Sequence, residues 1–321
     1  ILMNQEIVTI DLGSNSFRVL KYDCENHKII SEYNEVVGMA DGLVDTGIIS
    51  KEAMERVIKA ISHSIEVINY NPKDAICVTT AAMRKASNNK EVLKYFKDEI
   101  DADFSIIDGN EEARLTLLAV KYALKREKIN SEKFVLLDIG GGSTEFCFIK
   151  NGKIEKSISL NIGTVRIKEL YFNKDNIDGA KRYILDELRK ISDLNIEIPQ
   201  KVVGIGGSIR ALSKMIMSRN SYPLDILHGY TYSVKKEANL FNKIVDARNN
   251  DDLKSLGVKK DRFDTIKEGA FIFKTILDEL CVQEVITSGV GVREGVYLTD
   301  LLRNSNHKFP SNFNVSVRSL L

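Results

Sequence analysis

The stretch "VLLDIGGGSTEFCFI" at residues 135–149 places three consecutive glycines just after an apolar run that ends in an aspartate. Strands rarely tolerate this much glycine, because glycine loses the most backbone entropy on folding and offers no side chain to pack. The stretch "IVTIDLGSNSFRVLKY" at residues 7–22 has the same layout, with an apolar run, Asp, one apolar residue, Gly, three small residues and a second apolar run. The chain is therefore expected to make the same glycine turn twice.

One shift of the sequence superimposes the two turns. It places Asp11 on Asp138, Gly13 on Gly140 and Ser16 on Ser143. Two positions further on the charge differs, since the residue is Arg18 in the first turn and Glu145 in the second. Nearly the same shift aligns "ICVTTAAMR" at 76–84 with "VVGIGGSIR" at 202–210, each a strand-like run, a small-residue turn and an arginine entering a helix. Two motifs in one order at nearly one offset predict a duplicated α/β domain.

Hydrophobic periodicity predicts strands that alternate with helices in both halves of the chain. In the first half we expect strands at 6–12, 17–24, 28–37, 75–80 and 104–108, and helices at 50–70, 89–100 and 111–126. In the second half we expect strands at 134–139, 144–150, 153–160 and 201–207, and helices within 165–191 and at 208–217. This alternation indicates a mostly parallel sheet flanked by helices in each half.

Composition limits the classes of protein that the chain can represent. Its 321 residues are 43% hydrophobic and carry a net charge of +1. That is enough for a sizeable core in about two domains, and it argues against a surface built to bind nucleic acid or membrane. The four cysteines, at positions 24, 77, 147 and 281, are far apart, and we interpret them as reduced core residues. No basic and apolar leader precedes the first strand and no apolar run approaches ~20 residues, so we expect a cytoplasmic protein.

The two glycine turns indicate a binding site for an anion. If two similar domains face each other, the turns lie on opposite walls of one cleft, where backbone N–H groups can approach a ligand closely. Phosphate is the ligand that such turns favour. The aspartate that ends each strand would repel phosphate on its own, but it can hold a divalent cation, Mg²⁺ or Mn²⁺, that bridges carboxylate and phosphate oxygens.

Six ordered motifs carry a resemblance to a known family. The turns "DLGSNSFR" (11–18) and "DIGGGSTE" (138–145) resemble the phosphate loops of the sugar kinase, heat-shock protein and actin superfamily. Within it, the chain resembles the exopolyphosphatase and guanosine pentaphosphate phosphohydrolase family. The further motifs are "TTAAMRKASN" (79–88), "GNEEARL" (109–115), "GIGGSIRAL" (204–212) and "SGVGVREGV" (288–296).

The resemblance implies a fold and a reaction. The fold is α/β, with two similar actin-like (ribonuclease H-like) domains at 1–125 and 126–300 and an interdomain cleft. Residues 301–321 resemble the truncated start of a further helical domain. The reaction is hydrolysis of the terminal phosphate of inorganic polyphosphate or guanosine pentaphosphate, with no nucleic-acid or membrane partner.

The resemblance also implies roles for the acidic residues near the motifs. Asp138 and Glu145 resemble the family's metal ligands, with Asp11 as a weaker candidate, and the metal would be Mg²⁺ or Mn²⁺. Glu112 matches the family's catalytic glutamate, which activates water. For Glu111 we expect only a favourable interaction with the helix dipole, as is common for carboxylates in a first helical turn.

The remaining candidates would bind phosphate. Arg84 suits bidentate contact with a terminal phosphate, although a surface ion pair is the alternative for this arginine. The full set of expected phosphate-binding residues is Ser14, Asn15, Arg84, Gly140, Gly141, Gly142, Ser143, Gly206 and Gly207. Basic side chains that could hold the rest of a long polyphosphate are those of residues 84–90 and of Arg166, Arg210, Lys214 and Arg219.

Several alternatives stay open from the sequence. The same two turns would serve an ATP-dependent small-molecule kinase, a chaperone-like ATPase or a non-hydrolysing sensor of alarmone nucleotides or polyphosphate. The preferred substrate and the chain length do not follow from the motifs, because both substrates share the same terminal phosphoanhydride. Oligomeric state does not follow either, and a homodimer is left open.

Overall fold

The computed structural model describes residues 6–24, 26, 28–130, 132–224 and 227–303. The chain divides into two compact units, each built around one sheet. Unit 1 holds the described parts of Ile1–Met39, Ile48–Val120 and Gly291–Leu321, and unit 2 holds the described parts of Ala40–Gly47 and Lys121–Val290. The chain thus enters unit 2 briefly at Ala40 and returns to unit 1 at Gly291, so this division is not the linear one expected at 125/126. Of the segment expected at 301–321, all residues beyond 303 lie outside the described part.

Unit 1 is a five-stranded sheet with the order β3-β2-β1-β4-β5. Its strands are β1 (Glu6–Leu12), β2 (Ser16–Asp23), β3 (Lys28–Val36), β4 (Ile76–Thr79) and β5 (Phe104–Ile106). The first three form an antiparallel meander, and β4 and β5 continue the sheet in parallel with β1. The helical elements are α2 (Lys51–Ile68), η1 (Pro72–Asp74), α3 (Ala81–Lys85), α4 (Asn89–Ile100), the first part of α5 (Gly109–Arg126) and α12 (Val292–Arg303).

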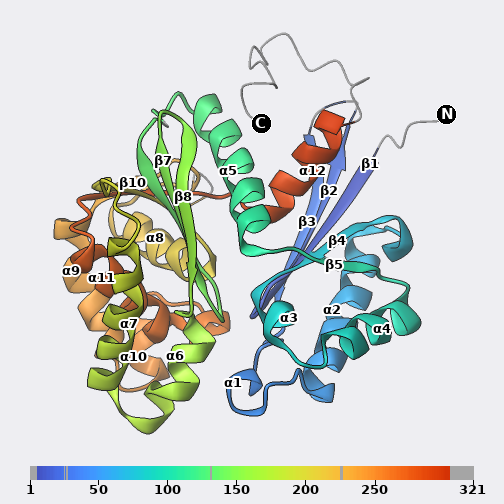
Figure 1. Ribbon diagram of the computed structural model, residues 1–321, viewed down its shortest axis with the longest axis horizontal. Helices are drawn as coiled ribbons and strands as arrows, with labels where there is room; N and C mark the ends of the chain where they lie inside the picture. Colours follow the sequence, from blue (N-terminus) through green and yellow to red (C-terminus); the bar gives the residue numbers. More distant parts are fainter. Residues whose placement is uncertain (1–5, 25, 27, 131, 225–226, 304–321) are drawn as a thin grey trace. The chain divides into compact units, whose positions relative to one another are not determined.

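Helices α5 and α12 cover the face of this sheet that carries Asp11. Val78 of β4 packs with Leu115 of α5 and with Val292 and Val296 of α12, and α12 lies against β1 and β2 (Figure 1). Val78 is the register partner of Asp11, so both side chains project from the same face of the sheet. The aspartate of the first glycine turn is therefore on the covered side of the sheet, where it is buried.

A buried arginine ties α12 to the sheet. The Arg293 guanidinium donates to Glu294 Oε1 at 2.7 Å, to Asn34 Oδ1 at 3.0 Å and to Glu32 Oε2 at 2.5 Å. The Arg293 carbonyl accepts a hydrogen bond from Thr9 Oγ1 at 3.2 Å. A buried charge costs several kcal/mol of desolvation unless it is paired and hydrogen-bonded. These contacts therefore restrict α12 to one position on β1 to β3.

Unit 2 is a six-stranded sheet with the order β10-β11-β9-β6-β7-β8. Its strands are β6 (Phe134–Ile139), β7 (Thr144–Lys150), β8 (Lys153–Leu160), β9 (Lys201–Ile205), β10 (Thr231–Ser233) and β11 (Glu284–Thr287). Strands β6 to β8 form an antiparallel meander, β9 is parallel to β6 and β11, and β10 pairs antiparallel with β11. The helical elements are α1 (Leu43–Thr46), α6 (Thr164–Leu170), η2 (Phe172–Lys174), α7 (Ile177–Ser192), α8 (Gly207–Arg219), α9 (Val234–Val245), α10 (Asn250–Ser255), η3 (Lys260–Arg262) and α11 (Ile266–Glu279).

The core of unit 2 joins the sheet to the helices α7, α8, α9 and α11. Phe146 and Phe148 project from one face of β7, because alternate residues of a strand point to the same side. Phe273 of α11 packs edge-on against Phe241 of α9, with ring centroids 5.8 Å apart. The two units confirm the expected α/β class, since each opens with three antiparallel strands and adds parallel strands beside the first.

Three of the four cysteines are buried, and one is exposed. Cys24, Cys77 and Cys147 are buried as expected, and burial raises the thiol pKa of Cys77 and of Cys147 to about 12. Cys281 is exposed, so its assignment to the core was wrong.

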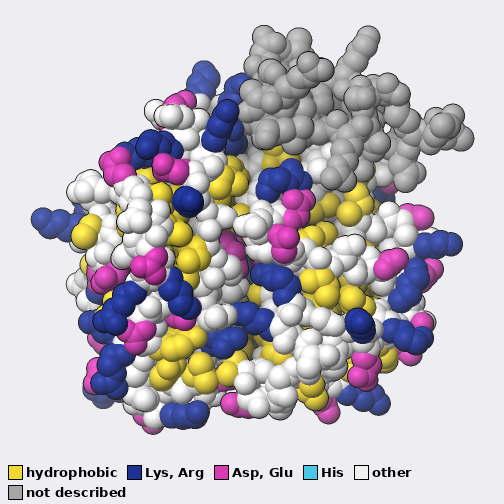
Figure 2. Space-filling model, viewed as in Figure 1, with side chains coloured by type: hydrophobic (Ala, Val, Ile, Leu, Met, Phe, Trp, Pro, Cys, Tyr) yellow, Lys and Arg dark blue, Asp and Glu magenta, His cyan; other side chains and the backbone are white. Residues whose placement is uncertain are grey.

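Figure 2 shows positive and negative side chains intermixed over most of the face in view, in keeping with the near-zero net charge. Among the described residues, no helix is both long and apolar enough to span a membrane.

The crossing of α12 over α5 gives a stability prediction. A Cβ atom at Gly295 would lie 2.0 Å from the carbonyl oxygen of Leu115. We expect Gly295→Ala to lower the free energy of unfolding by about 1 to 3 kcal/mol, the usual cost of overpacking, and to outweigh the ~1 kcal/mol that alanine gains in helix propensity. Urea unfolding followed by circular dichroism measures the change. A variant as stable as the parent chain would show that the two helices separate without cost.

Candidate active site

The two glycine turns have the same backbone geometry. In unit 1 the amide of Gly13 donates to the carbonyl of Ser16, and in unit 2 the amide of Gly140 donates to the carbonyl of Ser143, both at 2.9 Å. Each turn joins the first two strands of its sheet, β1 to β2 and β6 to β7. The repeat predicted from the sequence is therefore confirmed at the level of individual hydrogen bonds.

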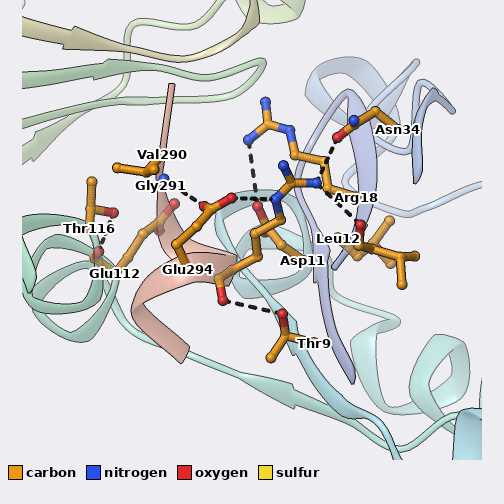
Figure 3. Close-up of polar contacts among 12 residues, drawn as sticks. Thr9, Asp11, Leu12, Arg18, Asn34, Glu112, Thr116, Val290, Gly291 and Glu294 are labelled. Carbon is orange, nitrogen blue, oxygen red and sulfur yellow. Dashed lines mark hydrogen bonds and ion pairs between the residues drawn. The ribbon is translucent and has the colours of Figure 1, made fainter. Parts of the chain in front are cut away.

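Strand register places a charged pair beside each turn. Asp11 is directly opposite Arg18, and Asp138 is directly opposite Glu145. Directly opposite residues of antiparallel strands project to the same face, with Cβ atoms about 5 Å apart. In unit 1 the pair has opposite charges, and Arg18 Nη1 lies 3.6 Å from Asp11 Oδ2 (Figure 3). In unit 2 the pair consists of two carboxylates.

Hydroxyl groups fix the carboxylate of Glu145. The side chain is buried, and its Oε1 accepts hydrogen bonds from Ser143 Oγ at 2.6 Å and from Ser159 Oγ at 2.9 Å. Ser143 thus holds a predicted metal ligand through its side chain, a role that the sequence did not suggest for it. Ser159 was missed altogether, because it lies in β8 and only the β7–β8 register brings it opposite Glu145.

The start of α8 lies beside Asp138. A Cβ at Gly206 would be 2.8 Å from Asp138 Oδ1, and Gly206 has φ +92°, which L residues with a side chain rarely adopt. A Cβ at Gly207 would be 2.4 Å from Nη1 of Arg262. Both glycines therefore permit close approach, in one case to a carboxylate and in the other to a guanidinium. Arg262 was missed because its segment, "KKDRFD" at 259–264, has no motif that distinguishes it from an exposed charged loop.

Unit 1 brings Arg84 and Glu112 together. Arg84 Nη1 donates to Glu112 Oε2 at 2.8 Å and to the carbonyl of Ile107 at 2.7 Å, and the Glu112 side chain is buried. Arg84 does form an ion pair, but its partner is the predicted catalytic residue. It lies in the last turn of α3, so the expectation that it begins a helix was wrong: a helix of five residues ends directly after it.

Glu111 forms a local ion pair within α5. Glu111 forms two hydrogen bonds with Arg114, both at 2.7 Å, as an i,i+3 pair on the outside of α5. This geometry agrees with the purely local role expected for it.

In the first glycine turn Ser14 is buried, and the Asn15 carbonyl accepts from the amides of Val37 at 2.9 Å and Gly38 at 3.2 Å.

The basic residues expected to hold a long substrate divide into two groups. Arg166 Nε donates to the carbonyl of Gly142 at 3.2 Å, and Arg210 donates to the carbonyls of Ser288 at 2.9 Å and Val290 at 3.1 Å. These two side chains therefore support the backbone of unit 2. Lys214 and Arg219 are exposed on α8, as a contact for a long anion would require.

A sequence profile of the Ppx/GppA phosphatase family matches residues 19–304. The chain belongs to this family. It is 28% identical over 298 residues to the bifunctional 3-dehydroquinate synthase/phosphatase of Fusobacterium nucleatum. The alignment covers 87% of this chain and 44% of that protein. The chain therefore spans less than half the length of that relative.

Solved structures of the Ppx/GppA family have the same fold. A family member from Aquifex aeolicus is 26% identical, with a TM-score of 0.73 over 95% of this chain and 99% of that one. The crystal structure of an exopolyphosphatase from Cytophaga hutchinsonii is 24% identical, with a TM-score of 0.82 over 92% of this chain and 98% of that one. The two actin-like α/β domains expected from the resemblance are thus those of the Ppx/GppA family.

A buried carboxyl group lies near the start of α8. Glu268 of α11 precedes Gly269, where a Cβ would be 2.5 Å from Ser208 of α8. Burial raises the pKa of Glu268 to about 7, while Lys168 and Lys267 lower it and Asp264 raises it by smaller amounts. No sequence pattern distinguished Glu268, because its position on α11 becomes buried only when that helix packs against the rest of unit 2.

The raised pKa of Glu268 predicts a pH-dependent stability. The folded chain binds this proton more tightly than the unfolded chain, whose glutamate has the ordinary pKa of 4.5. The free energy of unfolding should therefore fall by roughly 3 kcal/mol as pH rises from about 4.5 through about 7. We expect Glu268→Gln to match the parent near pH 5 and to exceed its stability at pH 8 in urea unfolding. Equal pH dependence in the two chains would contradict this.

Proposed function

We propose that the chain is a phosphohydrolase that removes the terminal phosphate of inorganic polyphosphate, of guanosine pentaphosphate or of both. The proposal starts from the membership in the Ppx/GppA phosphatase family. The observation that carries it is the pair of carboxylates, Asp138 and Glu145, facing one another at the end of the glycine turn. Two like charges in that position are unfavourable without a cation, and a cation beside backbone amides is the environment that a phosphate chain requires.

The carboxylates of unit 2 fit a divalent cation. Mg²⁺ is usually held by one or two carboxylates, with water and phosphate oxygens in the other positions. The described residues contain no group of three or more His, Cys, Asp and Glu side chains arranged to hold a metal, so the substrate would supply further ligands. Bound there, Mg²⁺ or Mn²⁺ would neutralise charge on the phosphoryl oxygens. Asp11 fits less well, since Arg18 already lies 3.6 Å from it.

Glu112 and Arg84 would supply the remaining chemistry. We infer that Glu112 accepts a proton from the attacking water while the water oxygen bonds to the terminal phosphorus. The phosphoanhydride bond then breaks, and its bridging oxygen leaves with the bonding electrons on the shortened chain. Arg84 contacts Glu112 at 2.8 Å and presents a planar set of N–H donors suited to phosphate oxygens. The guanidinium would thus orient both the base and the substrate.

Phosphate release from polyphosphate tests the proposal directly. The purified chain with Mg²⁺ should release phosphate from polyphosphate or guanosine pentaphosphate with no other nucleotide present, and kcat/KM for the two substrates decides between them. Release that requires ATP and an acceptor would favour the kinase. Tight binding of both compounds without turnover would favour the sensor.

The metal site predicts a specific change in cation dependence. EDTA should abolish turnover, and Asp138→Asn or Glu145→Gln should raise the Mg²⁺ concentration for half-maximal rate by about tenfold or more, because even indirect ligands alter metal affinity by that factor. Glu155→Gln on β8 is the matched control, since it removes one carboxylate from the same sheet at a site paired only locally with Lys150. Full activity in EDTA would overturn the metal site.

Glu112→Gln separates the catalyst from a binding protein. Glutamine keeps the size and hydrogen-bonding reach of the side chain but cannot take up the proton, so kcat should fall by ~10² to 10⁴-fold with little change in KM. Glu111→Gln is the control, because Glu111 is the neighbouring carboxylate on α5 and pairs with Arg114 of the same helix. It should leave kcat nearly unchanged. Unaltered kcat in Glu112→Gln would show that another group activates the water.

A further inference from the structure

The short helix α6 lies directly behind the glycine turn of unit 2. The amide of Thr164 donates to the carbonyl of Gly140 at 3.0 Å, and the amide of Val165 donates to the carbonyl of Gly141 at 2.9 Å. Amides in the first turn of a helix have no partner within the helix and commonly bind side chains, water or anions. In α6 the amides of Thr164 and Val165 instead donate to carbonyl groups of the glycine turn.

Arg166 extends this contact to the third glycine. Its amide donates to Gly141 O and its Nε to Gly142 O, both at 3.2 Å. On its other side the guanidinium interacts with Tyr183 of α7, whose hydroxyl donates to the carbonyl of Asn161 at 2.9 Å. Three consecutive residues, 164–166, therefore donate hydrogen bonds to all three glycine carbonyls.

Peptide geometry converts this contact into a direction for the amides. A trans peptide unit is planar, so the N–H of each residue points opposite to the carbonyl of the residue before it. With the carbonyls of residues 140–142 directed at α6, the N–H groups of Gly141, Gly142 and Ser143 are directed away from it. The Gly140 amide is different, because it donates to Ser143 O. The amides directed away from α6 are thus those of residues 141–143, and the Gly140 amide is not among them.

Gly163 makes the close approach of α6 sterically feasible. A Cβ at this position would lie 2.3 Å from Gly141 O and 2.5 Å from the carbonyl carbon of Gly142. The backbone of Gly163 is ordinary, with φ −149° and ψ 156°, so conformational freedom is not the reason for glycine. Glycine is needed at this position because there is no room for a Cβ atom, so any side chain would push α6 and the turn apart.

We propose that Gly163 and Arg166 are positioning residues that hold the glycine turn from behind, so that the amides of residues 141–143 face the terminal phosphate of the substrate. The inference rests on the proposed function for the identity of the anion. It assigns Arg166 to the support of the turn and not to the binding of a long substrate. It also removes the N-terminus of α6 from the groups that contact the anion.

Hydrogen exchange of single amides tests the geometry in the full chain. In the ligand-free protein the amides of Thr164 and Val165 should be protected, and that of Gly141 should exchange freely. Tripolyphosphate with Mg²⁺, kept in excess, should slow exchange at Gly141 and Ser143 by about tenfold or more. Unprotected Thr164 and Val165 would overturn the support by α6 and leave the proposed function standing. Protected Thr164 and Val165 with no effect of tripolyphosphate on Gly141 would overturn the proposed function.

Binding of tripolyphosphate by calorimetry tests the two residues. Arg166→Gln should weaken binding about tenfold, the size expected for loss of a charge-assisted hydrogen bond, while Arg166→Lys should recover part of it. Lys168→Gln is the matched control, because it removes one positive charge from α6 but faces Asp264 at 4.0 Å. Equal weakening in Arg166→Gln and Lys168→Gln would show that only charge matters.

Gly163→Ala supplies an independent readout that involves no change in charge. We expect it to weaken tripolyphosphate binding more than Arg166→Gln does, with faster exchange at Val165, because the added methyl group displaces Gly141 O. Its melting temperature should be measured beside that of the parent. A folded Gly163→Ala chain that binds tripolyphosphate like the parent would overturn the inference.

Discussion

The antiparallel register of the two glycine hairpins is the constraint on which the chemistry of this protein depends. Each hairpin closes with the same hydrogen bond from the glycine amide to the serine carbonyl, so the side chain opposite each aspartate is fixed. In unit 1 that side chain is Arg18, and the pair is neutral. In unit 2 it is Glu145, and the pair is doubly negative. The same backbone turn therefore carries an arginine opposite the aspartate in unit 1 and a second carboxylate in unit 2, where we propose that a cation binds.

The glycine turn of unit 2 is held by contacts that a side chain at any of several positions would abolish. The entropy lost in ordering three consecutive glycines is offset in part by the hydrogen bonds that their carbonyls accept from α6. Those bonds need Gly163 close behind the turn, and the carboxylate of Asp138 needs Gly206 beside it. The glycines outside the motif are therefore as much a part of the turn as Gly140 to Gly142. Because Gly163 and Gly206 lie far from the motif in the sequence, the motif alone does not predict their contact with the turn.

Local patterns predicted the local structure well and the long-range contacts poorly. The strands at 134–139, 144–150 and 153–160 and the helix at 89–100 were predicted to the residue, because alternation and helical periodicity are properties of the segment itself. No helix or strand was predicted after residue 217, although α11, β11 and α12 complete both units there. Arg262 comes from that region, and only tertiary packing brings it beside Gly207 of α8. The docking of residues 40–47 on unit 2, where the Gly42 amide donates to Glu169, was missed for the same reason.

The contact between Arg84 and Glu112 limits what a single substitution of Arg84 can reveal. Their side chains are only 21% and 11% exposed, so removal of the guanidinium leaves a carboxylate in a place with little water. A loss of activity in Arg84→Ala would then combine a missing phosphate contact with a displaced Glu112. Only the double-mutant comparison separates the two effects, because it subtracts the cost of breaking the pair from the cost of losing each role. In a protein whose site is built from such pairs, the pair and not the residue is the unit to which a function is assigned.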